Sequence, residues 1–176
     1  MAGTLSVRDS RDADVAAITS IYAHWVRRGF GSFEIAAPDE AEMSERRARL
    51  LAQGYPWLVA ERAGRVCGYA YAGPYRSREA YRFACENSIY VSPDACGSGV
   101  GRALLSELIA RCEGMGLRLM VAGIGDSGNA ASIGLHAAHG FIHAGTLSNI
   151  GWKGGRWLDV VFMTRALGNG AATAPE

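Results

Sequence analysis

The chain has 176 residues, of which 49% are hydrophobic and 20% charged, so it is long enough to bury the core of one compact domain. The 18 basic and 17 acidic residues give a formal net charge of +1, and neither sign forms a long run. This balance disfavours nucleic acid as a partner and favours a small molecule or a second copy of the chain. The four cysteines share no CxxC spacing and have no histidine at a metal-ligand spacing, so neither zinc nor a disulfide framework is expected.

No segment is long and apolar enough to cross a bilayer. Residues 1–15 also lack the basic start and apolar stretch of a targeting peptide. We therefore expect a cytoplasmic protein that does not bind a membrane.

The first part of the chain predicts one strand and two helices. Residues 5–8 form the expected strand, and Asp12 is the expected N-cap of a helix that ends near Gly29. A second helix is expected to begin at Pro38, because proline fits the first turn of a helix, and to end near Gly54.

A hairpin and a longer strand follow. The short turn at residues 63–65 contains glycine and separates two apolar runs, which predicts antiparallel strands at 57–62 and 66–71. Residues 81–92 alternate between apolar and polar positions, so one face can pack and the other is available for chemistry. The polar face carries Glu86, Ser88 and Tyr90.

The second half of the chain predicts helices and strands in turn. Helices are expected at residues 100–112 and 129–139, on either side of a buried strand at 117–124. Two final strands are expected at 141–148 and 157–167.

This order of elements predicts a single α/β domain over residues 1–167, with a mixed, mostly antiparallel central sheet flanked by helices. Residues 168–176 are small and polar, and we expect them to be disordered. No internal repeat is visible in the sequence.

Residues 96–101 read Cys-Gly-Ser-Gly-Val-Gly and join the predicted strand to the following helix. Glycine lets several backbone N–H groups converge at the positive end of the helix dipole, which suits a pyrophosphate. Taken alone, the motif fits a plain tight turn equally well. A Walker P-loop is excluded because no Gly-Lys-Ser/Thr follows, and a dinucleotide fold is disfavoured because antiparallel hairpins precede the motif.

Two motifs in the expected order make the chain resemble the GNAT N-acetyltransferase superfamily. Residues 92–105, S-P-x-x-x-G-x-G-V-G-x-x-L-L, are similar to its coenzyme A motif, and residues 129–141, N-A-A-S-I-G-L-H-x-x-x-G-F, are similar to its second signature. Within the superfamily, residues 73–82, 86–91 and 155–159 resemble the phosphinothricin and methionine sulfone acetyltransferases. The likeness extends over residues 5–167.

The resemblance implies a GNAT-like fold and a specific reaction. The domain would transfer an acetyl group from acetyl-CoA, without a metal, to the amino group of a small molecule such as phosphinothricin, methionine sulfone or methionine sulfoximine. A homodimer is also implied. Two alternatives stay open: a GNAT enzyme for another amine, such as a polyamine, an aminoglycoside or a protein N-terminus, and a non-catalytic acyl-CoA-binding homodimer.

The resemblance also assigns residues to the coenzyme. The expected coenzyme A contacts are Tyr90, Val91, Gly97, Ser98, Gly99, Val100, Gly101, Arg102, Asn129 and Ser132. The chain departs from the superfamily at Cys96, where Arg or Gln is usual, so one polar contributor to the phosphate loop is absent. We expect weakened or rearranged coenzyme contacts rather than lost binding, because such loops bind mainly through backbone N–H groups.

Acetyl transfer to an amine needs a base, a donor to the developing oxyanion and a proton for the leaving thiolate. Glu86 matches the glutamate proposed as the base in the resembling enzymes, and the backbone N–H of Val91 is the expected oxyanion donor. His136 stands where many members of the superfamily have a tyrosine that protonates the thiolate, and an imidazole can do so near neutral pH. A structural histidine that only assists the base stays open.

The resemblance places Phe33, Arg76, Arg78 and Tyr81 in segments that line the amine pocket. Arginine suits the capture of a carboxylate or phosphinate, although these arginines could equally be solvated loop charges. The candidates for the dimer interface are Trp152, Lys153 and Trp157, because aromatic residues favour buried contact surfaces.

Overall fold

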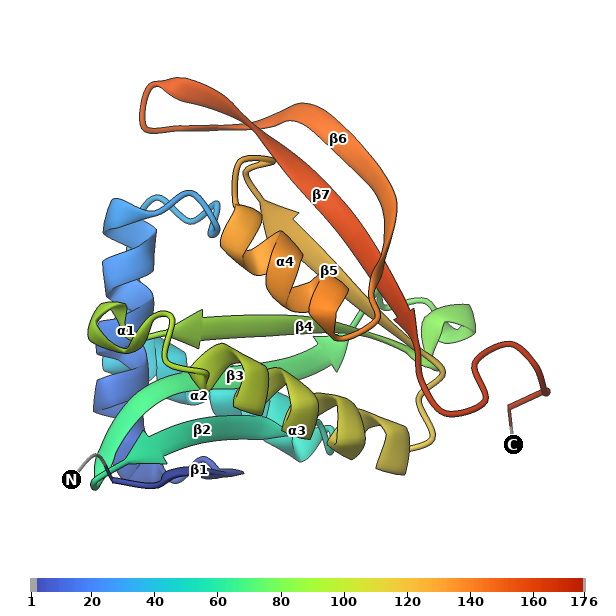
Figure 1. Ribbon diagram of the computed structural model, residues 1–176, viewed down its shortest axis with the longest axis horizontal. Coiled ribbons are helices and arrows are strands. Elements are labelled where there is room, and N and C mark those ends of the chain that lie inside the picture. The colour runs from blue at the N-terminus through green and yellow to red at the C-terminus, as the bar shows by residue number, and fades with distance from the viewer. Residues whose placement is uncertain (1–2, 176) are drawn as a thin grey trace.

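The computed structural model describes residues 3–175. Its strands are β1 (Leu5–Asp9), β2 (Trp57–Arg62), β3 (Arg65–Pro74), β4 (Ala84–Val91), β5 (Leu119–Gly125), β6 (Ile142–Lys153) and β7 (Arg156–Ala166). Its helices are α1 (Val15–Arg28), α2 (Glu40–Ala52), α3 (Val100–Gly114) and α4 (Ala130–Ala138). The strands form one sheet in the order β1-β2-β3-β4-β5-β7-β6, and only β4 and β5 are parallel (Figure 1). This confirms the predicted mixed, mostly antiparallel sheet flanked by helices.

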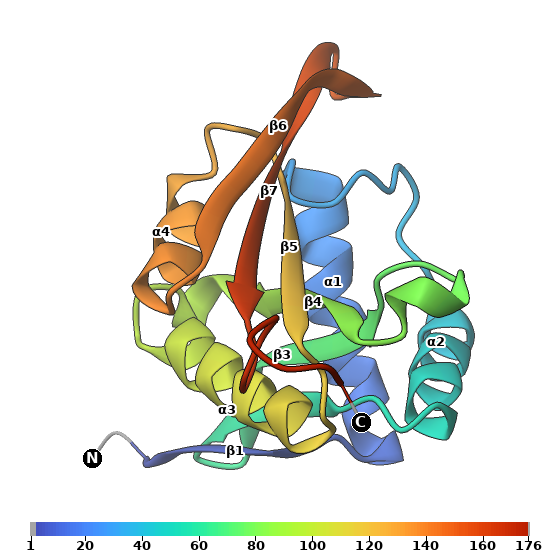
Figure 2. The same ribbon diagram turned by 90° about the vertical axis from the view of Figure 1, so that its right-hand side faces the viewer.

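The helices cover both faces of the sheet (Figures 1 and 2). On one face α1 and α2 pack over an aromatic cluster that includes the buried side chains Trp57 and Tyr69. On the other face α3 buries Leu104 and Leu108 against the strands, as the helical spacing of its apolar residues predicts. Among the residues that the structure describes, no helix has the length and apolar character needed to span a membrane.

The predicted ends of the first two helices are partly correct. Gly29 follows α1, as predicted. α2 begins at Glu40 and not at Pro38, because Asp39 is its N-cap and accepts a hydrogen bond from the backbone N–H of Glu42 at 2.9 Å. The N-cap prediction for Asp12 is wrong. Asp12 begins a short 3₁₀ turn, Asp12–Asp14, and the N-cap of α1 is Asp14.

Strands β4 and β5 diverge halfway along their length. Their parallel pairing runs only from Ala84 opposite Leu119 to Asn87 opposite Ala122. Beyond that point β4 stays paired with β3, whereas β5 stays paired with β7. The two strands therefore open into a wedge, which Figure 1 shows between the β4 and β5 arrows.

Strands β6 and β7 form a long hairpin that projects beyond the rest of the sheet (Figure 2). β6 extends to Lys153, past the predicted end at residue 148. Asn149 has a positive φ of 55°, and the pairing shifts register between Leu147 and Gly151. The strand therefore contains a bulge at the position where the sequence pattern predicts its end.

The remaining differences lie at the ends of elements. Tyr81 belongs to a short 3₁₀ turn, Glu79–Tyr81, and not to the strand predicted from residue 81. Residues 168–175 follow β7 as turns and bends, and Arg118 donates to the hydroxyl of Thr173 at 3.2 Å. The disorder expected over residues 168–176 stays a prediction, and Glu176 lies outside the described residues.

Candidate active site

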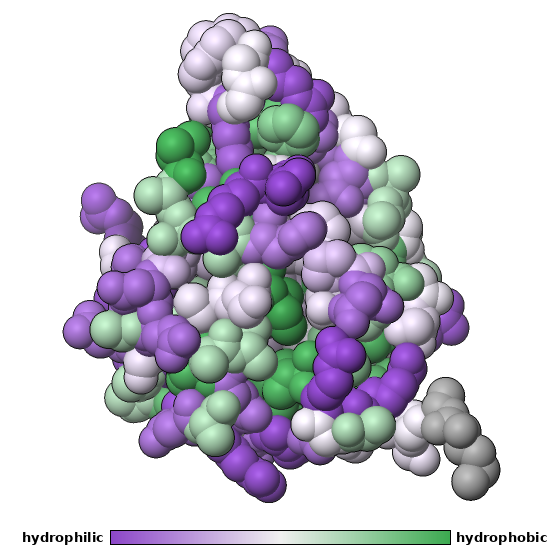
Figure 3. Space-filling view, turned by 90° about the vertical axis from the view of Figure 1, so that its left-hand side faces the viewer, coloured by the Kyte–Doolittle hydropathy of each residue, from purple (hydrophilic) through white to green (hydrophobic). Residues whose placement is uncertain are grey.

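A cavity of about 990 Å³ occupies the wedge between β4 and β5. Its walls come from the end of α1, the second half of β4, residues 95–102, the end of β5 and the start of α4. Figure 3 views the side where α1 and the 95–102 loop meet, with apolar surface visible in a hollow between polar groups. All ten predicted coenzyme A residues line this cavity.

The loop at residues 96–99 owes its shape to two glycines. Gly97 and Gly99 have φ values of +74° and +86°, in the left-handed region that other residues avoid. A Cβ at either position would meet nothing within 4 Å, so glycine is needed there for the backbone conformation and not for space. Gly99 is also the N-cap of α3, and the loop therefore lies at the positive end of a 15-residue helix.

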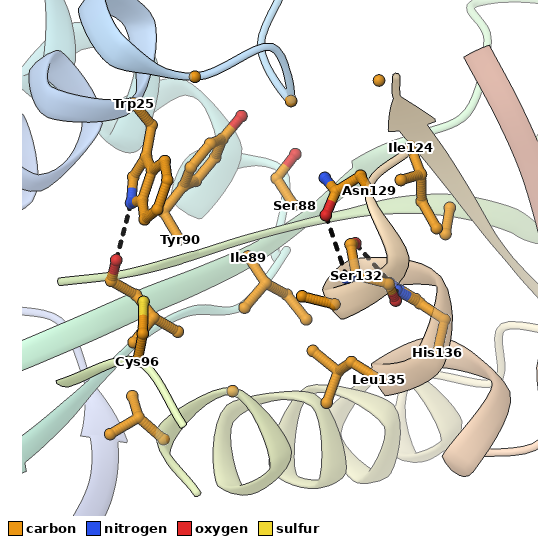
Figure 4. A pocket seen from close by; sticks show the side chains of 18 of the residues that line it. Trp25, Ser88, Ile89, Tyr90, Cys96, Ile124, Asn129, Ser132, Leu135 and His136 are labelled. Carbon is orange, nitrogen blue, oxygen red and sulfur yellow. Dashed lines mark hydrogen bonds between the residues drawn. The ribbon is translucent and has the colours of Figure 1, made fainter. Parts of the chain in front are cut away.

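The backbone of Val91 faces the cavity. In an antiparallel pair, hydrogen-bonded and non-bonded positions alternate, and the next residue, Ser92, donates its N–H to the carbonyl of Cys67 at 2.8 Å. The N–H and carbonyl of Val91 therefore point away from β3 and into the wedge. The Nε1–H of Trp25 donates to that carbonyl at 2.7 Å (Figure 4). Trp25 lines the cavity, and the helical pattern of residues 12–29 does not indicate this position.

Asn129 and Ser132 meet at the start of α4. The side-chain oxygen of Asn129 accepts the backbone N–H of Ser132 at 3.2 Å, so Asn129 caps this helix. The hydroxyl of Ser132 lies 3.4 Å from Nδ1 of His136 (Figure 4).

His136 is buried, with 4% of its surface exposed, and each ring nitrogen faces an oxygen. Nδ1 lies 2.8 Å from the carbonyl of Ser132, and Nε2 lies 3.0 Å from Oδ1 of Asn87. The Asn87 amide cannot turn freely, because its Nδ2–H donates to the carbonyl of Val121 at 3.1 Å. Burial lowers the pKa of His136, and the hydrogen bond with the Ser132 carbonyl offsets part of this effect.

Glu86 lies on the opposite side of β4 from Asn87, because successive residues of a strand face opposite sides. Its carboxylate has no hydrogen bond or ion pair to any of residues 3–175. Burial raises the pKa of Glu86, and the positive charge of Arg76 opposes the shift. Oε1 lies 2.9 Å from where a Cβ of Gly123 would be, so the glycine makes room for the carboxylate. Glu86 does not line the large cavity itself.

The four predicted substrate residues separate into two pairs. A Cβ on Gly125 would lie 3.0 Å from the Phe33 ring, and Gly123 and Gly125 share one face of β5, so Phe33 is on the same side of the sheet as Glu86. Arg76 is exposed but close enough to act on Glu86. Arg78 and Tyr81 flank or form the exposed 3₁₀ turn, and none of the four lines the large cavity.

The loop that carries Phe33 is held by the β6–β7 hairpin, a set of contacts that the sequence did not reveal. Lys153 is buried and donates from Nζ to the carbonyl of Ser32 at 2.6 Å. A Cβ on Gly151 would overlap the Phe33 ring, so only glycine fits there. The guanidinium of Arg156 lies 4.0 Å from the centre of the Phe30 ring. Within residues 3–175, no group of three or more His, Cys, Asp or Glu side chains could hold a metal.

Comparison with known proteins connects this site to an established family. A profile of the Acetyltransferase (GNAT) family matches residues 18–141. The chain is 57% identical to a phosphinothricin N-acetyltransferase of Alcaligenes faecalis, over 97% of this chain and 87% of that protein. It is 43% identical to an L-methionine sulfoximine/L-methionine sulfone acetyltransferase of Salmonella typhimurium, over 96% of this chain and 98% of that protein.

A solved structure gives the same result. The GNAT superfamily phosphinothricin acetyltransferase from Sinorhizobium meliloti, in complex with acetyl-CoA, matches with a TM-score of 0.95 and 48% identity, over 98% of this chain and 94% of that chain. The resemblance inferred from the two sequence motifs is thereby confirmed. The chain belongs to the GNAT acetyltransferase family and is an N-acetyltransferase that uses acetyl-CoA as its cosubstrate.

Proposed function

We propose that the enzyme acetylates the α-amino group of a small amino acid-like substrate of the phosphinothricin, methionine sulfone or methionine sulfoximine type. One observation carries the proposal: the Glu86 carboxylate has no partner among residues 3–175, and it lies beside Gly123, where the sheet opens. The relatives from Alcaligenes faecalis and Salmonella typhimurium, which are named for these substrates, support the substrate class.

Glu86 is the proposed general base. The α-amino group of an amino acid is mostly protonated at pH 7, so it must lose a proton before it attacks the thioester. A carboxylate without an ion-pair partner can accept that proton, and a raised pKa improves its match to the amine. Arg76, which acts on Glu86 through its charge, is the proposed contact for the acidic group of the substrate.

The other two catalytic roles belong to β4 and α4. The N–H of Val91 is the proposed oxyanion donor, because it points into the wedge and has no strand partner there. His136 lines the cavity on the side opposite Glu86 and is the proposed source of the proton for the thiolate. The base and the acid therefore act on the reacting centre from opposite sides of one strand.

We further propose that the enzyme is a cytoplasmic homodimer. Trp152 and Trp157 at the hairpin are 56% and 59% exposed, and their rings meet edge to face with centres 5.3 Å apart. Large exposed aromatic pairs of this kind favour a protein interface.

The test is a coenzyme A release assay with a panel of amines. Phosphinothricin, methionine sulfone and methionine sulfoximine are expected to give kcat/KM values at least about tenfold above those of a polyamine, an aminoglycoside and an N-terminal peptide. A higher value for any of the last three would move the assignment to another amine. No release of coenzyme A with any amine would favour a non-catalytic acyl-CoA-binding protein.

A further inference from the structure

An arginine from a distant strand contacts the phosphate loop. Arg62, the last residue of β2, donates from Nη1 to the hydroxyl of Ser98 at 3.3 Å and from Nη2 to the Ser98 carbonyl at 3.2 Å. In the sheet, β3 lies between β2 and β4, so the Arg62 side chain reaches past one strand to arrive at the loop. Its neighbour in this contact, Ser98, lines the large cavity.

The charges around the loop single out two arginines. Asp94, the one carboxylate in residues 92–102, accepts hydrogen bonds from the Ser92 hydroxyl and from Arg65 at 2.9 Å, so the Arg65 charge is already compensated. Arg62 and Arg102 have no carboxylate within salt-bridge distance among residues 3–175. They are the cations at this loop that remain free to bind an anion.

Acetyl-CoA carries a pyrophosphate and a 3′-phosphate, and a guanidinium can pair with either. The loop offers backbone N–H groups at the start of α3, but Cys96 adds neither charge nor a strong donor. A guanidinium has five N–H hydrogens, of which the two bonds to Ser98 use two. Arg62 therefore has donors left for a phosphate oxygen while it stays attached to the loop.

We propose that Arg62 binds a phosphate group of acetyl-CoA and supplies the cationic contact that Cys96 does not provide. The proposal depends on acetyl-CoA as the cosubstrate and not on the identity of the amine. If the proposed amine substrates proved wrong, the proposal for Arg62 would be unaffected.

The first experiment measures acetyl-CoA binding by calorimetry in wild type, Arg62→Met, Arg62→Lys and Arg49→Met. Arg49 is an exposed residue of α2, so its substitution removes the same charge far from the cavity. Arg62→Met is expected to weaken binding by about tenfold to 150-fold, the range of one hydrogen bond to a charged group, and Arg62→Lys by less. Arg49→Met is expected to bind like wild type. Equal affinities for Arg62→Met and wild type would overturn the proposal.

Salt and truncated ligands then separate a phosphate contact from a structural role in the loop. The affinity difference between Arg62→Met and wild type is expected to shrink as salt rises, because salt screens an exposed charge pair. With acetyl-dephospho-CoA, a retained effect would identify the pyrophosphate as the partner and a lost effect the 3′-phosphate. With S-acetylpantetheine, which has neither group, the substitution is expected to leave kcat/KM unchanged. A loss as large as that for acetyl-CoA would overturn the proposal.

Discussion

Glu86 and Asn87 are neighbours in the chain, yet their side chains point to opposite sides of β4. The alternation of a strand turns Glu86 toward Phe33 and Gly123, and it turns Asn87 toward His136 of α4. The parallel pairing of β4 with β5 ends at Asn87, so both side chains lie where the two strands separate. One dipeptide thus supplies a carboxylate to one side of the wedge and an amide that orients a histidine to the other.

Replacing Glu86 by Gln is expected to keep acetyl-CoA binding and to reduce turnover by about 10²-fold or more, the usual effect of losing a general base. Turnover should recover partly at higher pH, because solution then supplies the neutral amine. The measurement is a pH–rate profile of both proteins. Unchanged turnover would remove Glu86 from the mechanism and leave His136 or a substrate-bound water as the candidate base.

The melting temperature of Glu86→Gln gives a second test with a defined sign. Because burial raises the pKa of Glu86 above its ordinary 4.5, the folded protein holds this proton at pH values where the unfolded chain has lost it. The contribution of Glu86 to stability is therefore greatest below pH 4.5 and falls as pH rises through the folded pKa. At pH 7 the Gln variant should melt no lower than wild type, whereas a structural glutamate would make it melt lower.

Replacing Asn87 by Leu should destabilise the fold as well as slow the reaction. The substitution leaves Nε2 of His136 and the carbonyl of Val121 without their partners, which costs about 1–3 kcal/mol for a buried group. For a chain of this length the melting temperature should fall by about 2–12 °C for each group that is left unpaired. Asn87→Asp keeps an acceptor for Nε2 and, by adding a negative charge, should raise the pKa of His136 in a ¹⁵N NMR titration. Unchanged melting of the Leu variant would contradict the observed hydrogen bonds.

At the scale of elements, the strand–loop–helix unit at residues 84–114 contains most of the residues proposed to contact the coenzyme. β4 ends at the wedge, the loop turns through two left-handed glycines, and α3 begins with its N-terminus at the cavity. The same residues therefore set the position of the Val91 N–H and of the loop N–H groups. A change in loop conformation should therefore weaken coenzyme binding more than it lowers the stability of the fold.

Gly99→Val should weaken acetyl-CoA binding more than it lowers stability. A β-branched residue at a φ of +86° costs on the order of 1–2 kcal/mol, while its Cβ would meet no atom within 4 Å. Gly114→Ala, near the other end of the same helix, is the matched control, because that position also has open space but no positive φ. Calorimetry measures the acetyl-CoA affinity of both variants, and thermal melting measures their stability. Equal losses of binding and stability in Gly99→Val would indicate that the glycine serves only the folding of the loop.

Elements with a strong local signal could be predicted from the sequence. The alternation of β4, the glycines at 97 and 99 and the Asn129 cap each depend on residues close together in the chain, and the structure contains all three. Contacts between distant elements could not be predicted in this way. The bond of Lys153 to Ser32 joins residues 121 positions apart, and no local pattern indicates it.

The whole molecule combines a compact body with a projecting hairpin that exposes several large apolar side chains. The large apolar side chains of β6 and β7 that are exposed are Ile142, Leu147, Ile150, Trp152 and Trp157. β6 is also an edge strand, and an exposed edge with apolar side chains is avoided in a monomer unless a partner covers it. The turn end of this hairpin, at Lys153, is attached to the loop that carries Phe33. An interface at the hairpin would therefore be coupled to the amine side of the active site.

The last prediction is that the enzyme sediments as a dimer at concentrations on the order of 10 µM and that Trp152→Asp combined with Trp157→Asp makes it a monomer. Large aromatic side chains near the centre of an interface contribute most to binding, and charged groups there remain unpaired. Met115→Asp, at another exposed apolar position, is the control and should stay dimeric. Because Lys153 adjoins Trp152 and holds Ser32, the monomeric variant should show a raised KM for the amine with unchanged acetyl-CoA affinity. A wild-type protein that sediments only as a monomer would remove the interface, and a monomeric variant with an unchanged amine KM would remove the coupling.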